Sequence, residues 1–435
     1  MSELLKKDKT YVWHPFTQMQ TAPEPLVITR ASGAILYAED GKEYLDCNSS
    51  WWVNVHGHGN EHIAHAVTEQ IGSLDHVIFA GVTHPKAIEL AERVSKLLPD
   101  PLEKVFFSDN GSTAVEVALK MSFQFWHNQG ITKHRILALD GAYHGDTFGA
   151  MSVGQRGYFN EPFEPFFFDV DFLDFPNDQN EPFLLERAEK LFASGEFAAL
   201  IVEPLIQGSA GMRMYNASWL DELVILARKF GVFVIFDEVM TAWGRTGKLF
   251  AMDHCAQKPD IVCLSKGLTG GVLPLGLTVA TPQIYQAFLS DEMAKGFLHG
   301  HSFTGNPIAC AAACASIDLF EKKETWKNID RIHSVYNEHR KLFLGHPQIQ
   351  SIRMLGTILA IELKTGEGNT YFSGVRDHCY AFFIENGILM RPLGNVIFLN
   401  PPYCMSDEQL KKALKKIREL ADRMAHNSEN GLLIR

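Results

Sequence analysis

GVFVIFDE, at residues 231–238, is a continuous apolar run that ends in two acidic residues. A second run of this kind, DIVCLSK at residues 260–266, ends in a lysine. Strands that are apolar throughout, rather than alternating, are typical of a parallel sheet covered on both faces. We therefore expect two neighbouring buried strands, with Asp237 and Lys266 at their carboxyl ends, where such sheets bind ligands.

An alternation of strands and helices extends on both sides of this stretch. Thr113–His127 carries apolar residues at helical spacing, and Ala217–Phe230 is predicted to be a second helix. The predicted strands are Lys104–Ser108, Arg135–Asp140, Ala198–Glu203, Gly231–Glu238, Ile261–Ser265 and Gly276–Ala280. Such alternation predicts a large α/β domain with a mostly parallel central sheet.

The two ends of the chain have a different pattern. Leu26–Asp46 alternates apolar and polar residues around Ser-Gly and Asp-Gly turns, which predicts a meander or hairpin. The elements predicted near the other end are strands at Thr357–Leu363, Ile388–Pro392 and Val396–Asn400 and a helix at Asp407–Met424 that begins with a capping box of Ser406 and Gln409. We expect residues 1–55 to join a small α+β domain formed by residues 311–435, and residues 56–310 to form the large domain.

Composition limits the class of protein. The 435 residues carry a net charge of −11, with 46% hydrophobic and 21% charged residues, which excludes a disordered chain. The acidic balance argues against nucleic acid and anionic membranes as partners. No signal peptide or membrane span is recognisable, and the seven cysteines are scattered without a C-x-x-C pair. We expect reduced thiols and a cytoplasmic protein.

Lys266 and Asp237 are the sharpest pair of candidate functional residues. A lysine among small neighbours, Ser265 and Gly267, leaves room for a bulky cofactor to form a Schiff base with its nitrogen. A carboxylate one strand away suits a pyridine nitrogen that must stay protonated. Taken alone, the two residues also suit a surface lysine and a strand-end cap.

Two turns that follow predicted strands complete the pattern. In SDNGS at residues 108–112, Gly111 allows close backbone approach, and Ser112 with the first helical N–H groups could hold a phosphate. An ordinary helix cap explains that turn equally well. In GAYHGD at residues 141–146, Tyr143 could stack on a flat ring or be a core residue. A turn that could bind phosphate, an aromatic ring that could stack, an acid and a lysine are together the features of a pyridoxal phosphate site.

The chain resembles the class III, ω-aminotransferase-like, fold type I pyridoxal phosphate enzymes along nearly its whole length. The segments that carry the resemblance are FSDNGSTAVEVALKM, YHGDTFGAMSV, IVEPLIQG, FDEVMTAWGRTGKLFA, DIVCLSKGLTGG and HGHSFTGNPIACAAA. The collinear set is specific, whereas no single segment is.

The resemblance implies roles for individual residues. Lys266 would bind the cofactor and move the substrate proton, Asp237 would hold the ring nitrogen, and Tyr143 would stack on the ring and line the substrate pocket. The other implied cofactor contacts are Gly111, Ser112, Gln207, His301 and Ser302, the last reaching in from a partner subunit. The implied substrate contacts are Phe16, Trp51, Trp52, Tyr143, Lys266, Gly300 of the partner side and Arg391. A homodimer with shared active sites is implied as well.

Within the class, the chain is most similar to members that convert 8-amino-7-oxononanoate to 7,8-diaminononanoate in biotin biosynthesis. The discriminating segments are WHPFTQM, NSSWWVNVHGH, GYFN and ILMRPLGNVIFLNPPY. A long aliphatic substrate suits the apolar wall offered by the two tryptophans, and its carboxylate suits Arg391.

The amino donor is the open point of this resemblance. S-adenosylmethionine is the usual donor. Position 16 is phenylalanine where many members carry tyrosine, and relatives with phenylalanine include some that are thought to use lysine. The alternatives are therefore lysine as donor, an ω-aminotransferase of the ornithine or 4-aminobutyrate type, and a catalytically idle binding protein on this scaffold.

Four histidines crowd HGHGNEHIAH, at residues 56–65: His56, His58, His62 and His65. The spacing resembles a metal site, but no cysteine or H-E-x-x-H frame accompanies it. We expect polar packing here and no metal.

Overall fold

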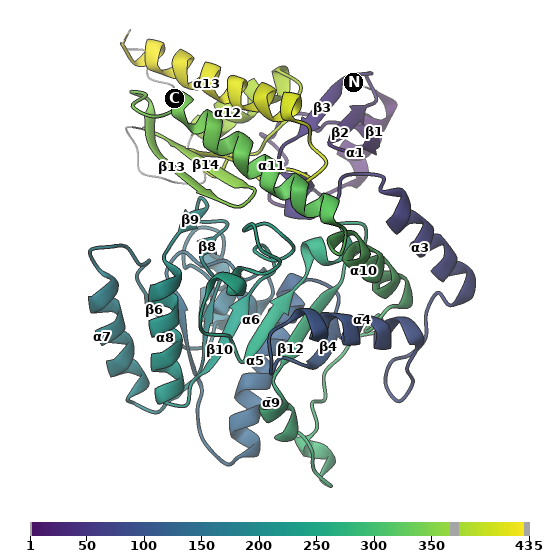
Figure 1. Ribbon diagram of the computed structural model, residues 1–435, viewed down its shortest axis with the longest axis vertical. Coiled ribbons are helices and arrows are strands. Elements are labelled where there is room, and N and C mark those ends of the chain that lie inside the picture. The colour runs from purple at the N-terminus through teal and green to yellow at the C-terminus, as the bar shows by residue number, and fades with distance from the viewer. Residues whose placement is uncertain (1, 366–373, 430–435) are drawn as a thin grey trace.

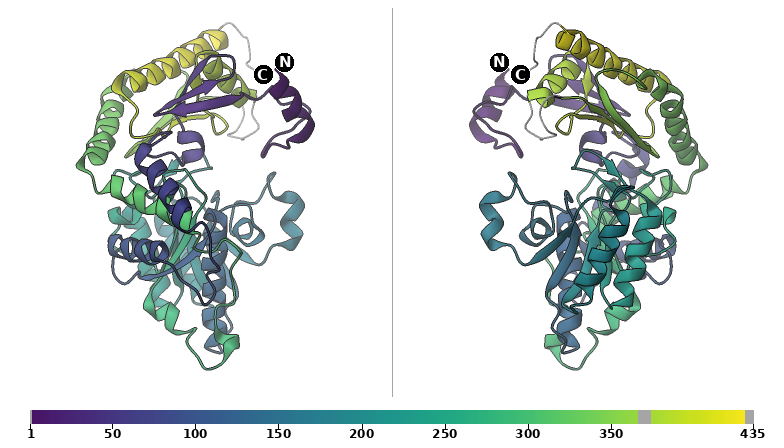
Figure 2. Two further views of the ribbon diagram at one scale, coloured as in Figure 1. Left: turned by 90° about the vertical axis from the view of Figure 1, so that its right-hand side faces the viewer. Right: turned by 90° about the vertical axis from the view of Figure 1, so that its left-hand side faces the viewer.

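The computed structural model of the protein describes residues 2–365 and 374–429. A larger part built around one wide sheet carries a smaller part at its upper end in Figure 1. Helix α11 (Lys323–His339) runs from the larger part into the smaller one along one side of the molecule (Figure 2). The expected α/β architecture is confirmed.

The central sheet has seven strands in the order β4-β12-β11-β10-β7-β5-β6. Their bounds are β4 Lys104–Ser108, β5 Arg135–Leu139, β6 Val170–Leu173, β7 Phe197–Val202, β10 Phe233–Asp237, β11 Ile261–Leu264 and β12 Gly276–Ala280. Strand β12 runs antiparallel to both of its neighbours, and the pairs among β11, β10, β7, β5 and β6 are parallel. The mostly parallel sheet is thus confirmed. The apolar run Gly276–Ala280 predicted a strand, but an apolar run does not indicate the direction of its strand, so the reversal of β12 was not predicted.

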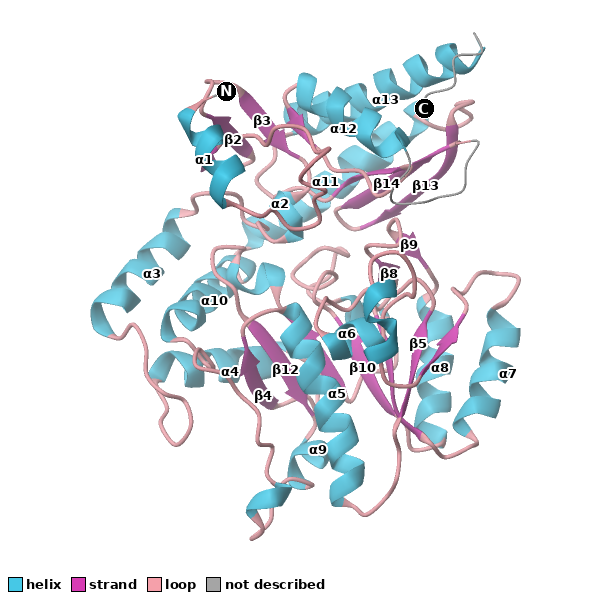
Figure 3. Cartoon of the chain, turned by 180° about the vertical axis from the view of Figure 1, so that it is seen from behind, coloured by secondary structure: helices cyan, strands magenta, loops and turns pink. Residues whose placement is uncertain are grey.

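Helices cover both faces of this sheet, which is why its strands are apolar throughout. On β5, Ile136 and Ala138 join the cluster that contains helix α5, whereas Leu137 and Leu139 join the cluster of α4, α7, α8 and α10. Seen from behind, α5 and α6 lie in front of the sheet (Figure 3). The helices of this part are α3 Glu61–Ser73, α4 Pro85–Leu97, α5 Gly111–Asn128, α6 Phe148–Ser152, α7 Glu181–Phe192, α8 Ala217–Lys229, α9 Pro282–Gln286 and α10 Pro307–Phe320. The short 3-10 helices are η1 Glu161–Phe166, η2 Ala251–His254, η3 Lys266–Thr269 and η4 Met293–Lys295, and the hairpin strands are β8 Ile206–Gln207 and β9 Arg213–Met214.

Both ends of the chain contribute to the smaller part. One sheet has the order β1-β2-β3-β15, and its last strand pairs in parallel with β3, Leu45 opposite Ile388. The strands are β1 Ile28–Ser32, β2 Ile35–Ala38, β3 Glu43–Asp46 and β15 Ile388–Leu389, with β13 Ile349–Leu355, β14 Ile358–Leu363 and β16 Val396–Leu399 in a second sheet. The helices are α1 Glu3–Tyr11, α2 Ser49–Trp52, α11, η5 Arg340–Leu342, α12 Gly374–Glu385 and α13 Asp407–Glu429.

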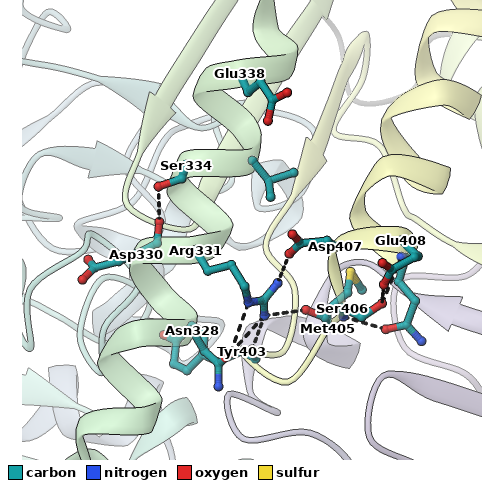
Figure 4. A network of polar contacts seen from close by, with 12 residues as sticks. Asn328, Asp330, Arg331, Ser334, Glu338, Tyr403, Met405, Ser406, Asp407 and Glu408 are labelled. Carbon is teal, nitrogen blue, oxygen red and sulfur yellow. Dashed lines mark hydrogen bonds and ion pairs between the residues drawn. The ribbon is translucent and has the colours of Figure 1, made fainter.

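The loop before α13 forms hydrogen bonds with α11 in the smaller part and with Trp243 in the larger part. Arg331 of α11 donates to Asp407 (2.6 Å) and to the carbonyl of Met405 (2.7 Å), as Figure 4 shows. The hydroxyl of Tyr403, in the same loop, donates to the carbonyl of Trp243 in the larger part (2.5 Å). The loop therefore joins α11, α13 and the larger part.

The predicted elements agree with the structure to within a few residues, except that the predicted strand Ile388–Pro392 is reduced to β15, Ile388–Leu389. Strands β6, β8, β9 and β13 were not predicted. The capping box is confirmed, because Ser406 and Gln409 exchange backbone-to-side-chain hydrogen bonds. The domain limits stay a prediction, and the one between residues 310 and 311 falls inside α10.

Within the described ranges, no helix is both long and apolar enough to cross a membrane.

Gly356, in the turn between β13 and β14, offers a test of how the two parts fit together. Its φ is +56°, and a Cβ there would lie 2.2 Å from the backbone nitrogen of Gly247. We expect Gly356→Ala to lower the free energy of unfolding by roughly 3 kcal/mol or more, because backbone must move in addition to the strain at positive φ. The measurement is the urea midpoint.

Gly345→Ala is the matched control. Its φ is +72°, and nothing lies within 4 Å of the added Cβ. It should lose only about 1 kcal/mol, the cost of a left-handed conformation for an L-residue. Equal losses in the two variants would contradict the close contact at Gly356.

Candidate active site

The carboxyl edge of the central sheet gathers the candidate residues because the strands end level with each other. Phe236 of β10 pairs with Val202 of β7, and Asp237 pairs with Cys263 of β11. The residues that follow these strands therefore meet at one edge. A cavity of about 400 Å³ lies there, lined among others by Asn110, Gly111, Ser112, Tyr143, His144, Glu203, Asp237, Val239, Lys266 and Trp52.

Lys266 leaves β11 in a left-handed conformation, with φ of +47°, and its amine lies 4.6 Å from the ring centre of Trp52. Burial lowers the pKa of this amine to about 8, although the nearby carboxylates of Asp237 and Glu203 act in the opposite direction. A larger share of neutral amine near neutral pH favours nucleophilic attack on an aldehyde.

The small residues near Lys266 allow close packing of the chain, whereas the sequence predicted that they leave room for a cofactor. Gly271 has a φ of +82°, and a Cβ there would lie 2.7 Å from the carbonyl carbon of Val53. The glycine therefore lets the loop pack tightly against the segment that carries Trp52, and Gly267 itself is buried. Space for a cofactor comes from the cavity, not from an open surface.

Asp237 is 4% exposed and has a donor on each carboxylate oxygen. The backbone N–H of Val239 donates to Oδ1 (3.0 Å), and Nδ1 of His144 lies 2.7 Å from Oδ2. Two donors on different oxygens fix the plane of the carboxylate. The group is suited to hold a proton on a ring nitrogen inside the cavity.

The start of α5 forms the other end of the cavity. Asn110 caps the helix through a capping box with Thr113. Ser112 accepts the N–H of Asp146 (3.2 Å), and a Cβ on Gly145 would lie 1.9 Å from the Ser112 hydroxyl oxygen. Gly145 therefore lets its turn pack closely against Ser112. The N–H groups of the first helical turn beside the Ser112 hydroxyl fit a phosphate.

Tyr143 and Val239 line the same cavity between its two ends. The hydroxyl of Tyr143 donates to Asp146 (3.0 Å), and burial with nearby carboxylates raises its pKa well above the usual value. An aromatic ring, a branched apolar side chain, an acid, a lysine and a phosphate cup are what pyridoxal phosphate requires. The residues present therefore fit this cofactor.

Gln207, by contrast, is absent from the cavity lining among the described residues. Its amide nitrogen donates to the carbonyl of Asp140 (3.1 Å), and its oxygen accepts from Arg213 (2.5 Å). The predicted contact of Gln207 with the cofactor stays a prediction that this arrangement does not favour.

Glu203, four residues earlier, lines the cavity instead. Its carboxylate accepts the backbone N–H groups of Tyr143 (3.0 Å) and Gly208 (2.9 Å), and burial raises its pKa to about 7. Glu203 was not predicted to be a site residue, although an acid directly after the apolar strand β7 is the same signal as Asp237 at the end of β10.

The two adjacent tryptophans have different surroundings. Trp52 is 6% exposed and lines the cavity, whereas Trp51 is 43% exposed. The ring of Trp51 lies 5.5 Å from that of Phe16, and the guanidinium of Arg391 lies 5.4 Å from the Trp51 ring centre. Phe16 also contacts Phe159, with ring centres 6.1 Å apart. The structure thus brings the predicted substrate residues Phe16, Trp51 and Arg391 together.

The backbone around these tryptophans is strained. Ser49, Ser50 and Trp52 have positive φ angles of 49°, 58° and 68°. Non-glycine residues keep such angles only where their surroundings hold them, and they cluster at functional sites. Here the carbonyl of Trp52 accepts from the fully buried Arg245 (3.1 Å), a residue that the sequence analysis did not single out.

Gly300, His301 and Ser302 lie away from this cavity in the same chain. Their loop packs through neighbouring residues on other elements, with Lys120 2.9 Å from His299 and the rings of His76 and Phe303 5.4 Å apart. Ser302 is exposed. Their assignment to a partner's site stays a prediction.

The four histidines of residues 56–65 have separate partners. His56 contacts Ser316 (3.0 Å), His58 contacts Asp46 (2.8 Å), His62 contacts Asp318 (2.8 Å) and His65 contacts Glu69 (3.3 Å). The part of the chain that the structure describes contains no group of three or more side chains arranged to hold a metal ion.

Comparison with known proteins places this site in a family. The family model described as Aminotransferase class-III matches residues 17–420. Adenosylmethionine-8-amino-7-oxononanoate aminotransferase of Synechococcus elongatus is 46% identical over 95% of this chain and 98% of its own. The crystal structure of the enzyme of that name from Methanocaldococcus jannaschii has a TM-score of 0.91 at 35% identity, covering 97% of this chain and 98% of its own.

A more distant solved structure carries the cofactor. An amine transaminase from an uncultivated Pseudomonas species, in its PLP-bound form, has a TM-score of 0.89 at 28% identity, covering 95% of this chain and 98% of its own. Sequence, fold and the composition of the cavity agree, and the chain belongs to the class III aminotransferase family.

Proposed function

We propose that this enzyme transfers an amino group from S-adenosylmethionine to 8-amino-7-oxononanoate, giving 7,8-diaminononanoate in biotin biosynthesis. The observation that carries the proposal is the pair of Lys266 and Asp237 in one cavity, together with the cluster of Phe16, Trp51 and Arg391, which adjoins the cavity-lining Trp52 through its chain neighbour Trp51. The reaction and both substrates follow the names of relatives that align over nearly the whole chain.

Pyridoxal phosphate is the cofactor, and bound in this cavity it supplies an electron sink for negative charge that develops at the substrate carbon. Gly111 and Ser112, at the start of α5, would hold its phosphate. Tyr143 would stack on one face of its ring, and the carboxylate of Asp237 would keep its ring nitrogen protonated. Val239, which the same cavity exposes, would contact the other face.

Lys266 would provide the nucleophile that binds the cofactor and then move a proton to and from the substrate carbon. Both tasks require the neutral amine, and burial favours that form by lowering the pKa of Lys266 to about 8. Substrate bound in the cavity would displace water from the site of this proton transfer.

The aromatic cluster and Arg391 account for the proposed acceptor. A nonanoate chain offers methylene groups to the rings of Trp51 and Phe16, and its carboxylate can pair with the guanidinium of Arg391. Arg391 is exposed, and it makes no ion pair with any residue in residues 2–365 and 374–429. Its charge is therefore available to a ligand.

Lysine is the second candidate donor, and Phe16 is the observation that favours it. A phenylalanine ring offers no hydroxyl to a donor, so recognition at this position depends on apolar contact alone. Phe16 has a φ of 51° and packs between Trp51 and Phe159, so the ring itself is held in place.

We further propose a cytoplasmic homodimer. Seven free thiols, six of them buried, support a reducing compartment. Large apolar side chains on the loops that precede α4 and α10 are exposed in the single chain. Among them are Ile78 (64% exposed), Leu298 (65%) and Phe303 (62%). Neighbouring residues Gly300 and Ser302 would then reach the partner's cavity.

The first test concerns Lys266. Purified protein should be yellow, and borohydride should fix the cofactor to a peptide that contains Lys266. Lys266→Ala should lose the visible band and about 10³-fold or more of the activity, because nucleophile and proton carrier are the same group. Uptake of pyridoxal phosphate by cofactor-free protein should speed up as pH rises through about 8, since the amine must lose its proton.

Lys133→Ala is the matched control for this test. Lys133 also lies over a tryptophan ring, 3.8 Å from Trp126, and burial lowers its pKa as well. It should keep the band, the activity and the pH profile. Labelling of a lysine other than Lys266 would refute the assignment.

Arg391→Ala should raise the acceptor KM at least about tenfold, because a charge-assisted pair with the substrate carboxylate is lost. The half-reaction with the amino donor, followed by absorbance, should survive. Arg30→Ala, which removes an exposed guanidinium 3.6 Å over Tyr37 on β1 and β2, should leave both unchanged. An unchanged acceptor KM in Arg391→Ala would remove this residue from the proposed substrate site.

The donor can be identified by mixing the loaded enzyme with each amine separately and following conversion of the cofactor to its amine form. We expect conversion by S-adenosylmethionine. Conversion by lysine alone would correct the donor and leave the acceptor as proposed, and conversion by neither would point to another ω-amine. Phe16→Tyr should shift the preference between the two donors if the residue at this position contacts the donor.

Complementation between two inactive variants tests whether each active site is shared by the two subunits. Lys266→Ala and Ser302→Asp chains should each be inactive, because one lacks the nucleophile and the other repels phosphate. Mixed and refolded together, they should regain up to about a quarter of wild-type activity, since a hybrid dimer of two chains has one intact site. No recovery, or an active monomer in sedimentation, would refute the shared site.

A further inference from the structure

Asn48 is a buried polar residue between β3 and the two tryptophans, and the proposed chemistry gives it no task. It is 3% exposed. Its amide oxygen, Oδ1, accepts the backbone N–H of Arg391 (2.7 Å), and its amide nitrogen, Nδ2, donates to the carbonyl of Phe398 (3.0 Å). An N–H only donates and a carbonyl only accepts, so the two partners fix the orientation of the amide. Asn48 therefore connects the N-terminal segment to the segment that carries Arg391.

The acceptor that Asn48 provides replaces one that the backbone does not give. Strands β3 and β15 pair in parallel, and the N–H of Cys47 donates to the carbonyl of Leu389 (3.0 Å). Continued by one step, a parallel ladder would give the N–H of Arg391 to the carbonyl of Cys47. That carbonyl accepts from Asn400 instead (2.9 Å). The side chain of Asn48 thus takes the place of the next acceptor in the ladder and determines where Arg391 leaves the sheet.

The backbone of Asn48 holds the other wall of the substrate site. Its carbonyl accepts the N–H of Trp52 (2.9 Å), within the segment of strained backbone described above. Asp46 holds this segment in place, because its Oδ1 accepts the N–H of Asn48 (3.1 Å) and its Oδ2 accepts that of Ser50 (2.7 Å). Strained backbone persists only where its surroundings fix it. Asn48 is therefore a fixed point from which Arg391 is placed.

These contacts link the two ends of the proposed acceptor. The reacting carbon must lie at the amine of Lys266, which is 4.6 Å from the ring centre of Trp52. The carboxylate must lie at the guanidinium of Arg391, which is 5.4 Å from the ring centre of Trp51. Asn48 binds the backbone of Trp52 through its carbonyl and the backbone of Arg391 through its amide. The spacing between the two ends depends on this residue.

We propose that Asn48 is a positioning residue, which fixes the spacing between Arg391 and the Trp52 side of the cavity and thereby the chain length of the acceptor. The inference rests on the proposed function, because this spacing selects a length only if Arg391 binds the acceptor carboxylate. Asn48 acts through the backbone of Arg391 and touches neither substrate nor reacting atoms in this role. Without Asn48, the guanidinium would take several positions, and acceptors of different length would bind more nearly equally.

The first measurement is kcat and KM of the loaded enzyme for three acceptors: 8-amino-7-oxononanoate and its analogues with one methylene group fewer and one more. In the wild type, we expect each analogue to have about tenfold lower kcat/KM, because the spacing suits one length. In Asn48→Leu, which has a similar volume and no hydrogen-bonding group, the KM for 8-amino-7-oxononanoate should rise about fivefold and the difference among the three lengths should shrink to about threefold or less. The visible band and the half-reaction with the donor should stay unchanged.

A double-mutant cycle tests whether Asn48 acts through Arg391. In the Arg391→Ala background, Asn48→Leu should have no further effect on the acceptor KM, because the guanidinium that Asn48 places is gone. An equal rise of KM in both backgrounds would mean that Asn48 acts on another group, and the proposal would be wrong. If Arg391→Ala alone leaves the acceptor KM unchanged, the proposed acceptor site fails first, independently of Asn48.

Asn180→Leu is the matched control. The Asn180 side chain also accepts a backbone N–H, that of Asn177 (2.7 Å), and donates to a backbone carbonyl, that of Phe175 (3.0 Å), in the loop before α7. This variant should lower thermal stability and leave the acceptor KM and the length preference unchanged. If Asn48→Leu behaves in the same way, Asn48 is only structural and the proposal is refuted.

Should Asn48→Leu fail to fold, Asn48→Ser takes its place in the same measurements. The serine hydroxyl is too short to reach both Arg391 and Phe398, so the acceptor KM and the length preference should change as expected for leucine. A serine variant with the KM and length preference of the wild type would overturn the proposal.

Discussion

The hydrogen-bond ladder from β7 through β10 to β11 determines where the chemistry of this protein lies. Pairing of Phe236 with Val202 and of Asp237 with Cys263 ends three strands at one level. A slip by one residue would turn Asp237 to the other face of the sheet. The apolar side chains on both faces hold the register, since each slip would expose or bury the wrong residues. The catalytic edge thus depends on packing far from the cavity.

Burial of charge is the second constraint on this edge. Asp237, Glu203, Lys266 and Arg245 are all largely removed from water, and isolated charges would be costly there. Hydrogen bonds compensate three of them: Asp237 and Glu203 accept two apiece, and Arg245 donates to the carbonyls of Pro401 and Trp52. Lys266 is the exception: its amine makes no such hydrogen bond in the described residues, and burial lowers its pKa to about 8.

The sequence predicted the strands of the central sheet other than β6, the edge at which Asp237 and Lys266 meet, and the turns at Gly111 and Tyr143, because apolar runs and turn residues act locally. It did not predict the reversal of β12, the hydrogen bonds of Gln207 with Asp140 and Arg213 or the contact of His144 with Asp237. These depend on pairings between distant segments, which a pattern along one strand does not encode. Glu203 had a local signal, the acid at the end of AALIVE, whereas the carbonyl partners of Arg245 had none.

The pairing of β3 with β15 has a consequence for how the protein is made. Leu45 and Ile388 are neighbours in one ladder, although the ribosome links them hundreds of residues apart. Contacts of such high sequence separation form late, because the intervening chain must first be ordered. Trp51 and Trp52 follow β3 directly, and Asn48 holds the backbone of both Arg391 and Phe398. The substrate side can therefore be completed only after Ile388 has been synthesised, whereas every strand of the central sheet has been synthesised once the chain reaches Ala280.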